Sequence, residues 1–158
     1  MLNYRTIIRI LGVILVTEGV FMWLAIPVSL IFGENDKLQF LLSGAITISA
    51  GMLAYLPVRR TNLQVNRRDG YVIVTGAWIL FSLFGTLPFL LTRSIPNFTD
   101  AFFETISGFT TTGASILNNI EELSHAVLFW RSLIQWLGGM GIILLTLLLL
   151  PFLGIGGM

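Results

Sequence analysis

Four long runs of apolar residues, separated by short polar segments, dominate the sequence. They cover approximately residues 7–32, 38–56, 71–91 and 127–153. Each run reaches the ~20 residues that an α-helix needs to cross the hydrocarbon layer of a bilayer. The pattern predicts four transmembrane helices. Pro27 should kink the first helix near its outer end, and Pro57 should end the second.

A shorter apolar segment, 99–108, lies between the third and fourth runs and is too short to span a membrane. Thr99 or Asp100 would be a suitable N-cap for it, and Gly108 a suitable C-cap. We expect a re-entrant half-helix, because irregular backbone at membrane depth is tolerated only inside protein or beside a wet cavity. Its C-terminal end would point toward a pore, where the helix dipole favours a cation.

The loop that follows, 109–114, contains Thr110-Thr111-Thr112-Gly113-Ala114. Backbone carbonyls and threonine hydroxyls are hard oxygen donors that can replace the water around a dehydrated alkali cation, and a glycine lets the backbone turn its carbonyls freely. We therefore expect an alkali cation to bind at Thr110, Thr111, Thr112 and Gly113. The alternative is a turn of small residues that allows close helix packing. The loop lacks the second glycine of the TVGYG filter, so its selectivity should be looser.

Composition narrows the class of protein. Of the 158 residues, 55% are hydrophobic and 11% are charged, whereas a soluble domain carries about 25% charged residues. Lipid must therefore be the solvent, and we predict an all-α membrane protein. The absence of cysteine and the single His125 exclude thiolate and histidine metal sites. No basic stripe points to nucleic acid, and we expect no cofactor.

The distribution of arginine predicts the orientation. Six arginines fall on one side of the predicted membrane: Arg5, Arg9, Arg59, Arg60, Arg67 and Arg68. The opposite side has Lys37 and Arg93, and could also include Arg131 at the start of the fourth helix. The positive-inside rule then places both termini and the loop 58–70 in the cytoplasm, and segment 92–126 outside. The first apolar run is too long for a signal peptide, so we expect it to be a retained helix.

Two carboxylates, Asp100 and Glu104, lie one helical turn apart in the short segment. No nucleophile, metal cluster or second histidine accompanies them, so we do not expect an enzyme. Asp100 is expected to cap the helix, and the alternative is that it supports the loop or adds charge at the outer mouth. Glu104 could either give the outer mouth a negative potential or bond the backbone behind the loop.

Other polar and small residues within the spans have structural alternatives. Glu18 lies inside the first span, where a charge is costly; it could be protonated, or paired with Arg131 or a hydroxyl, and we favour a structural polar contact. Arg131 could pair with Glu104 or Glu121, or extend to the interface. The fourth run contains Gly138, Gly139 and Gly141, which could form a hinge or allow close helix packing.

Several motifs together resemble one family. They are Thr99-Asp100-Ala101-Phe102-Phe103-Glu104, Ser107-Gly108-Phe109, the Thr110–Ala114 loop, His125-Ala126-Val127-Leu128-Phe129-Trp130-Arg131, Gln135-Trp136-Leu137-Gly138-Gly139-Met140-Gly141-Ile142, and the closing Leu150-Pro151-Phe152-Leu153-Gly154-Ile155-Gly156-Gly157-Met158. The set resembles the N-terminal part of the TrkH/TrkG potassium-uptake proteins of bacteria, in the Trk/Ktr superfamily. The first two helices match only in hydropathy and order.

The resemblance implies a domain order and a location. Residues 1–57 would be two leading helices, 58–70 a basic loop, and 71–158 one membrane-pore-membrane repeat. Within the repeat, 71–92 is the outer helix, 99–108 the pore helix, 109–114 the filter and 127–153 the inner helix. The family also implies a multi-pass protein of the bacterial or archaeal inner membrane, and a cytoplasmic nucleotide-binding regulatory subunit as a partner.

The same resemblance implies that potassium is the transported ligand, held at Thr111 and Thr112. It would cross a pore lined by four repeats, whereas this chain contains one. Either four copies assemble as a homotetramer, or the chain is a fragment of a longer transporter. A different hypothesis is a non-conducting membrane interaction subunit. A third is a small four-helix exporter, for which Glu18 is the available carboxylate within a span.

Overall fold

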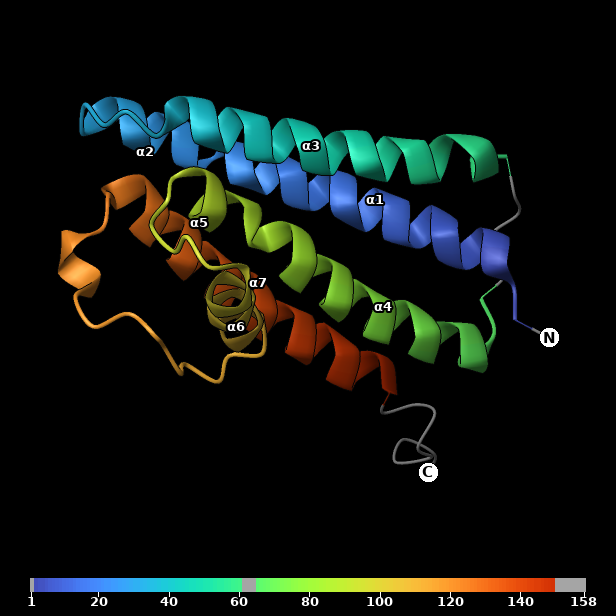
Figure 1. The fold of residues 1–158 in the computed structure, drawn as a ribbon. Helices are drawn as coiled ribbons and strands as arrows, with labels where there is room; N and C mark the ends of the chain where they lie inside the picture. The colour runs from blue at the N-terminus through green and yellow to red at the C-terminus, as the bar shows by residue number, and fades with distance from the viewer. Residues whose placement is uncertain (1, 61–64, 150–158) are drawn as a thin grey trace.

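The computed structural model describes residues 2–60 and 65–149, which form helices and connecting loops (Figure 1). The helices are α1 (Tyr4–Trp23), α2 (Ala25–Ile31), α3 (Lys37–Tyr55), the 3₁₀ turn η1 (Leu56–Val58), α4 (Arg67–Gly85), α5 (Leu87–Leu91), α6 (Phe98–Phe109), the 3₁₀ turn η2 (Ile120–Glu122) and α7 (His125–Leu149). Four stretches are long and apolar enough to cross a membrane: Tyr4–Ile31, Lys37–Val58, Arg68–Leu91 and His125–Ile143. The expected all-α fold with four spans and a short intervening helix is confirmed. The expected end of the fourth span and the closing motif lie outside the described residues.

Proline interrupts two of the spans. The first is broken at Leu24, between α1 and α2, just before Pro27, which agrees with the expected kink. The third is broken at Thr86, and Pro88 stands in the first turn of α5. Because a proline has no N–H for the carbonyl four residues earlier, it weakens the turn that precedes it. The second break was not among our expectations, although its cause is the same as that of the first.

Paired glycines bring α1 and α3 together along two turns. A Cβ on Gly12 would lie 2.9 Å from the carbonyl oxygen of Gly51, and a Cβ on Gly19 would lie 2.8 Å from that of Gly44. Backbones can approach this closely only where no side chain intervenes. The two leading helices therefore form a tight antiparallel pair, which lies alongside α4 in Figure 1.

The short helix α6 lies between α4 and α7 and crosses them, so that Figure 1 shows it nearly end-on. The Phe109 ring at its C-terminal end stacks on Phe81 of α4, with 5.1 Å between the ring centroids. The Trp130 indole N–H of α7 donates to the carbonyl oxygen of Gly85 over 3.1 Å. These contacts connect α4, α6 and α7, and they set the position from which the next loop begins.

The two ends of the bundle differ in charge. The start of α1, the turn η1 and the start of α4 lie at one end, which holds Arg5, Arg59 and Arg60 (Figure 1). The backbone N–H of Asn3 donates to Asp69 Oδ1 there over 3.0 Å. The grouping is the one that the positive-inside rule needs. Which compartment this end faces stays a prediction.

Candidate ion-binding site

Helix α6 begins and ends at different residues from those we expected. The side chain of Asn97 is the N-cap, because its Oδ1 accepts a hydrogen bond from the backbone N–H of Thr99 over 3.1 Å. The expectation of Thr99 or Asp100 as the cap is wrong. Asp100 instead lies in the first turn, where its negative charge meets the positive end of the helix dipole.

The expected C-cap, Gly108, is also wrong. The helix continues through Phe109, and Thr110 is the C-cap. Gly108 is needed for packing, because a Cβ there would lie 2.8 Å from Ile134 Cδ1 on α7. A glycine near a helix end can indicate either the end of the helix or a close approach of another helix. Here it indicates the close approach of α7.

The first residues of the loop after α6 fold back onto the last turn of the helix. The N–H of Thr111 donates to the Gly108 carbonyl oxygen, and the N–H of Thr112 to that of Ser107, each over 3.0 Å. Both Thr111 and Gly113 have left-handed backbone, with φ of 56° and 76°. A β-branched residue in that region carries strain of about 1–2 kcal/mol. Thr111 is therefore a strained residue at the centre of the candidate site, which the sequence alone did not reveal.

The loop residues lie at the surface. Residues Thr110 to Gly113 are exposed in the described part of the chain. The Thr110 hydroxyl donates to the Ile106 carbonyl oxygen over 2.7 Å, and the Thr111 hydroxyl donates to the Thr110 carbonyl oxygen over 2.7 Å. The Thr110 and Thr112 hydroxyls are 2.8 Å apart. Because a hydroxyl that donates its proton keeps two lone pairs, these oxygens can still coordinate a cation.

The chain that leaves the loop is held against α6 by two side chains of that helix. The Ser107 hydroxyl donates to the Ala114 carbonyl oxygen over 2.6 Å. Glu104 accepts hydrogen bonds from the Ser115 hydroxyl over 2.9 Å and from the Ile116 backbone N–H over 3.1 Å. Sequence reasoning missed Ser107 and Ser115, because their roles depend on how the chain folds back on the helix.

Glu104 also joins the loop to α7. Arg131 Nε donates to Glu104 Oε1 over 2.7 Å, and the two side chains are 18% and 2% exposed. A buried carboxylate needs such partners, because desolvation of an unpaired charge is costly. This arrangement matches one of the two pairings expected for Arg131. Of the two roles expected for Glu104, the geometry fits bonding behind the loop.

The three glycines of α7 have different surroundings. A Cβ on Gly138 would lie 2.7 Å from the carbonyl carbon of Phe109, and it would overlap the carbonyl oxygen. A Cβ on Gly139 would meet only Thr111 Cγ2, at 3.9 Å, and one on Gly141 would meet Trp78 at 3.6 Å. Gly138 is therefore required for the contact between α7 and the end of α6, whereas its neighbour has room for a methyl group.

A further contact, between the loop after α2 and the start of α7, was not expected. Glu34 Oε1 accepts from the backbone N–H of His125 over 2.6 Å, and Oε2 accepts from that of Ala126 over 3.1 Å. The imidazole Nδ1 lies 2.9 Å from Glu34 Oε1, and the ring stacks on Phe32. Glu34 thus caps α7 from a position 91 residues earlier in the chain.

The pKa of Glu34 reflects these contacts. Partial burial acts to raise it, but the hydrogen bonds and charge from His125, with the bond from Ala126, lower the pKa below the ordinary 4.5. A lowered pKa means that the carboxylate stabilises the folded state above that ordinary value. This stabilisation is lost as the pH falls through the lower, folded-state value.

We expect Glu34→Gln to lower the free energy of unfolding by about 1 kcal/mol at neutral pH, because an uncharged amide is a weaker helix cap. The measurement is thermal unfolding in detergent from about pH 7 down to about pH 3.5. The difference from the unmodified protein should shrink as the pH falls below the ordinary 4.5. Asp36→Asn is the control, because Asp36 in the same loop makes no side-chain cap bond. A difference that is unchanged across this range would contradict the assignment.

Glu18 does not make the polar contact that we favoured. It is 1% exposed, and neither carboxyl oxygen has a hydrogen-bond partner among the described residues. Arg131, one of its expected partners, is bound to Glu104. Its Oε1 instead lies against the backbone of α4, 3.2 Å from the position of a Cβ on Gly85.

Comparison with known proteins gives consistent matches. The family model TrkH, described as a cation transport protein, matches residues 36–158. The Trk system potassium uptake protein TrkH of Halomonas elongata is 42% identical over 99% of this chain and 33% of its own length. TrkG of Escherichia coli K12 is 32% identical, over 98% of this chain and 32% of its own.

A solved structure has the same fold. The crystal structure of the potassium transporter TrkH from Vibrio parahaemolyticus has a TM-score of 0.90 and 40% identity, covering 99% of this chain and 34% of that one. The chain thus spans about a third of the length of the relatives that it matches. These relatives are named as potassium uptake proteins rather than as enzymes. Since the family model covers most of the sequence, the chain belongs to the TrkH family of cation transport proteins.

Proposed function

We propose that the loop Thr110–Gly113 supplies one quarter of an ion-coordinating ring in a potassium uptake pathway. One observation carries the proposal. The residues of the loop are exposed, while Ser107 and Glu104, whose side chains bind the segment after the loop, are buried. A turn that served only helix packing would bury its own small residues. The kinship with potassium uptake proteins supports the same function.

The chemistry is coordination without a covalent step. Ions would lose water to the carbonyl and hydroxyl oxygens of Thr111 and Thr112. The C-terminal end of α6, which carries the negative end of the helix dipole, precedes the loop and favours a cation there. The sequence from Thr110 to Ala114 contains no basic residue to repel it.

One loop cannot surround an ion, so the ring needs three more. The chain spans about a third of its relatives, and this favours further repeats on a longer polypeptide. A homotetramer of this chain is the second arrangement. The native mass of the functional assembly distinguishes them, because only the second gives four equal subunits. Both termini in the cytoplasm, and a cytoplasmic nucleotide-binding regulatory subunit there, remain part of the proposal.

Ion flux into liposomes tests the function. The intact assembly should pass potassium and rubidium faster than sodium and exclude chloride, because the loop presents only oxygen ligands. Chloride flux equal to potassium flux would contradict the proposal. Absence of any flux from well-folded assemblies would instead favour the non-conducting interaction subunit.

Gly113→Ser should lower the preference for potassium over sodium, or stop flux, without preventing folding. Gly113 has φ of 76° and open space around the position of a Cβ, so the cost is one of backbone conformation, about 1–2 kcal/mol. The Thr112 carbonyl that precedes it would turn away from the ion. Thr112→Ser keeps the hydroxyl and the backbone, and it should have a milder effect. The measurement is paired rubidium and sodium flux on folded samples of both variants. Unchanged selectivity in Gly113→Ser would favour the packing interpretation of the loop.

A further inference from the structure

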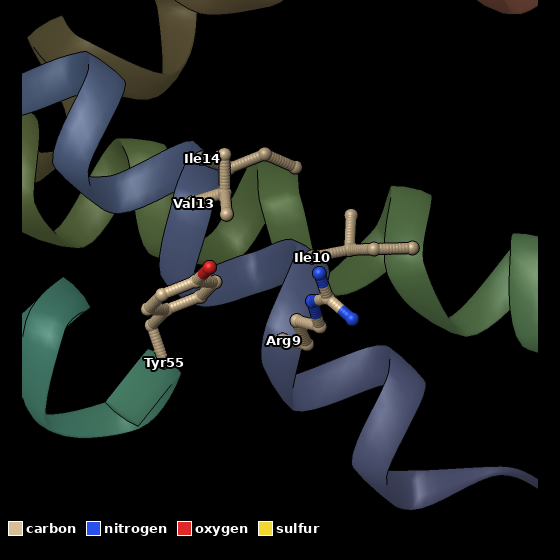
Figure 2. A pocket seen from close by; sticks show the side chains of 5 residues that line it. All are labelled: Arg9, Ile10, Val13, Ile14 and Tyr55. Carbon is tan, nitrogen blue, oxygen red and sulfur yellow. The ribbon is translucent and has the colours of Figure 1, made fainter. Parts of the chain in front are cut away.

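A groove between the two leading helices lies far from the candidate ion site. It has a volume of about 260 Å³ and is lined by Arg9, Ile10, Val13 and Ile14 of α1 and by Tyr55 at the end of α3 (Figure 2). The α1 residues recur at the spacing of one helix face. Two of its lining side chains, those of Arg9 and Tyr55, carry polar groups and the other three are aliphatic, a combination that suits a phospholipid.

The glycine pair described above shapes the groove. The Cβ of Tyr55 lies 3.2 Å from the position of a Cβ on Gly12, so the tyrosine is placed directly beside α1. The guanidinium carbon of Arg9 lies 6.0 Å from the centroid of the Tyr55 ring. A guanidinium N–H and a phenol O–H on neighbouring helices can both donate to the oxygens of one phosphate group.

The depth of the groove suits a headgroup. The first span, Tyr4–Ile31, has 28 residues, which is ~42 Å of helix against ~30 Å of hydrocarbon. If the excess length is shared equally between the two ends, the hydrocarbon boundary lies ~6 Å from the start of the span. Arg9 lies ~7.5 Å from that same start. The backbone of Arg9 is thus ~1.5 Å inside the boundary, from which its long side chain can extend to the headgroups, and Val13 and Ile14 are within the acyl region.

The charge around the groove is also appropriate. None of the five lining residues is acidic, and the exposed Arg59 and Arg60 lie at the same end of the bundle. Basic pockets between transmembrane helices bind anionic lipid headgroups. We propose that this groove binds one anionic phospholipid, with its phosphate at Arg9 and Tyr55 and an acyl chain along Val13 and Ile14.

Native mass spectrometry of the purified chain, in detergent with equal amounts of phosphatidylglycerol and phosphatidylcholine, tests the site. We expect one tightly retained phosphatidylglycerol. Arg9→Gln should lower its retention at least about fivefold, whereas the matched control Arg5→Gln, one turn earlier and exposed, should change it less than about twofold. Equal retention of the two lipids, or equal effects of the two arginine variants, would overturn the proposal.

A second variant separates the groove from general charge attraction. Val13→Trp fills the groove at a position that is 48% exposed and keeps every arginine. It should also lower retention of phosphatidylglycerol, and it decides the matter if Arg9→Gln fails to fold. Retention unchanged in Val13→Trp would contradict the proposal. Excess inorganic phosphate should not displace the lipid, and displacement would assign the site to free anions instead.

Discussion

Gly138→Ala is expected to reduce potassium uptake by about tenfold or more, whereas the same substitution at Gly139 should have little effect. The added Cβ would overlap the carbonyl oxygen of Phe109, which is backbone and cannot rotate away. Overpacking of this kind costs about 1–3 kcal/mol and is relieved by displacing one of the two helices. The strain falls on the contact between α7 and the C-terminal end of α6, because Phe109 is followed directly by the loop.

Two contacts hold the part of α7 before Gly138, one to α4 and one to α6. The Trp130 indole N–H is bonded to the Gly85 carbonyl oxygen, and Ile134 packs against Gly108 where a Cβ has no room. The strain of Gly138→Ala is therefore transmitted to Phe109 and to Thr110, which begins the loop. A shift there changes the positions of the oxygens that would coordinate the ion.

The matched control is Gly139→Ala, one residue farther along the same helix. Its Cβ would meet only Thr111 Cγ2 at 3.9 Å, an ordinary contact. Both variants gain the same helix propensity relative to glycine. The measurement is rubidium uptake in the intact protein, normalised to the amount of folded protein. Equal uptake by the two variants would show that the contact between α7 and α6 does not determine the position of the loop.

Glu104→Gln should both destabilise the protein and remove most uptake. The substitution leaves Arg131, which is 18% exposed, without its carboxylate, and breaking such a pair costs about 3–5 kcal/mol when both partners are buried. Partial exposure of Arg131 places the expected cost toward the lower limit, about 3 kcal/mol. The hydrogen bonds to Ser115 and Ile116 also weaken, since the acceptor loses its charge.

A double-mutant cycle isolates the pair. The double variant Glu104→Gln, Arg131→Gln should lose less stability than the two single variants lose together, because it retains no buried unpaired charge. Stability should thus recover in part, while uptake should not, because the loop still lacks its charged acceptor. Asp100→Asn, one turn earlier on the same helix, is the control and should be nearly neutral. Additive single effects, or a Glu104→Gln variant with full uptake, would contradict this account.

The large features of the fold were predictable because their driving force is visible in single residues. Each span is a run of apolar side chains, and transfer of such a run into lipid needs no distant partner. Pro27 broke the first span near the expected point, and Pro88 would have predicted the second break by the same rule. The short helix was located correctly because it is apolar yet too short to span.

The supports of the candidate site were less predictable because they join distant residues. Glu34 and His125 are separated by 91 positions, and nothing local to either indicates the other. Gly138 and Gly139 are neighbouring glycines that the sequence does not distinguish. Which of them faces Phe109 depends on the orientation of α7 about its own axis. The strain at Thr111 is a backbone property, and its sequence signal, a threonine directly after a helix C-cap, is weak.

The most direct test of the central claim is a density map of the intact functional assembly in potassium, compared with one in sodium. We predict ion density on a symmetry or pseudosymmetry axis, directly coordinated by carbonyl oxygens of Thr111 and Thr112 and occupied more strongly in potassium. A map in which these residues pack against another helix, with no ion between the loops in either salt, would contradict it.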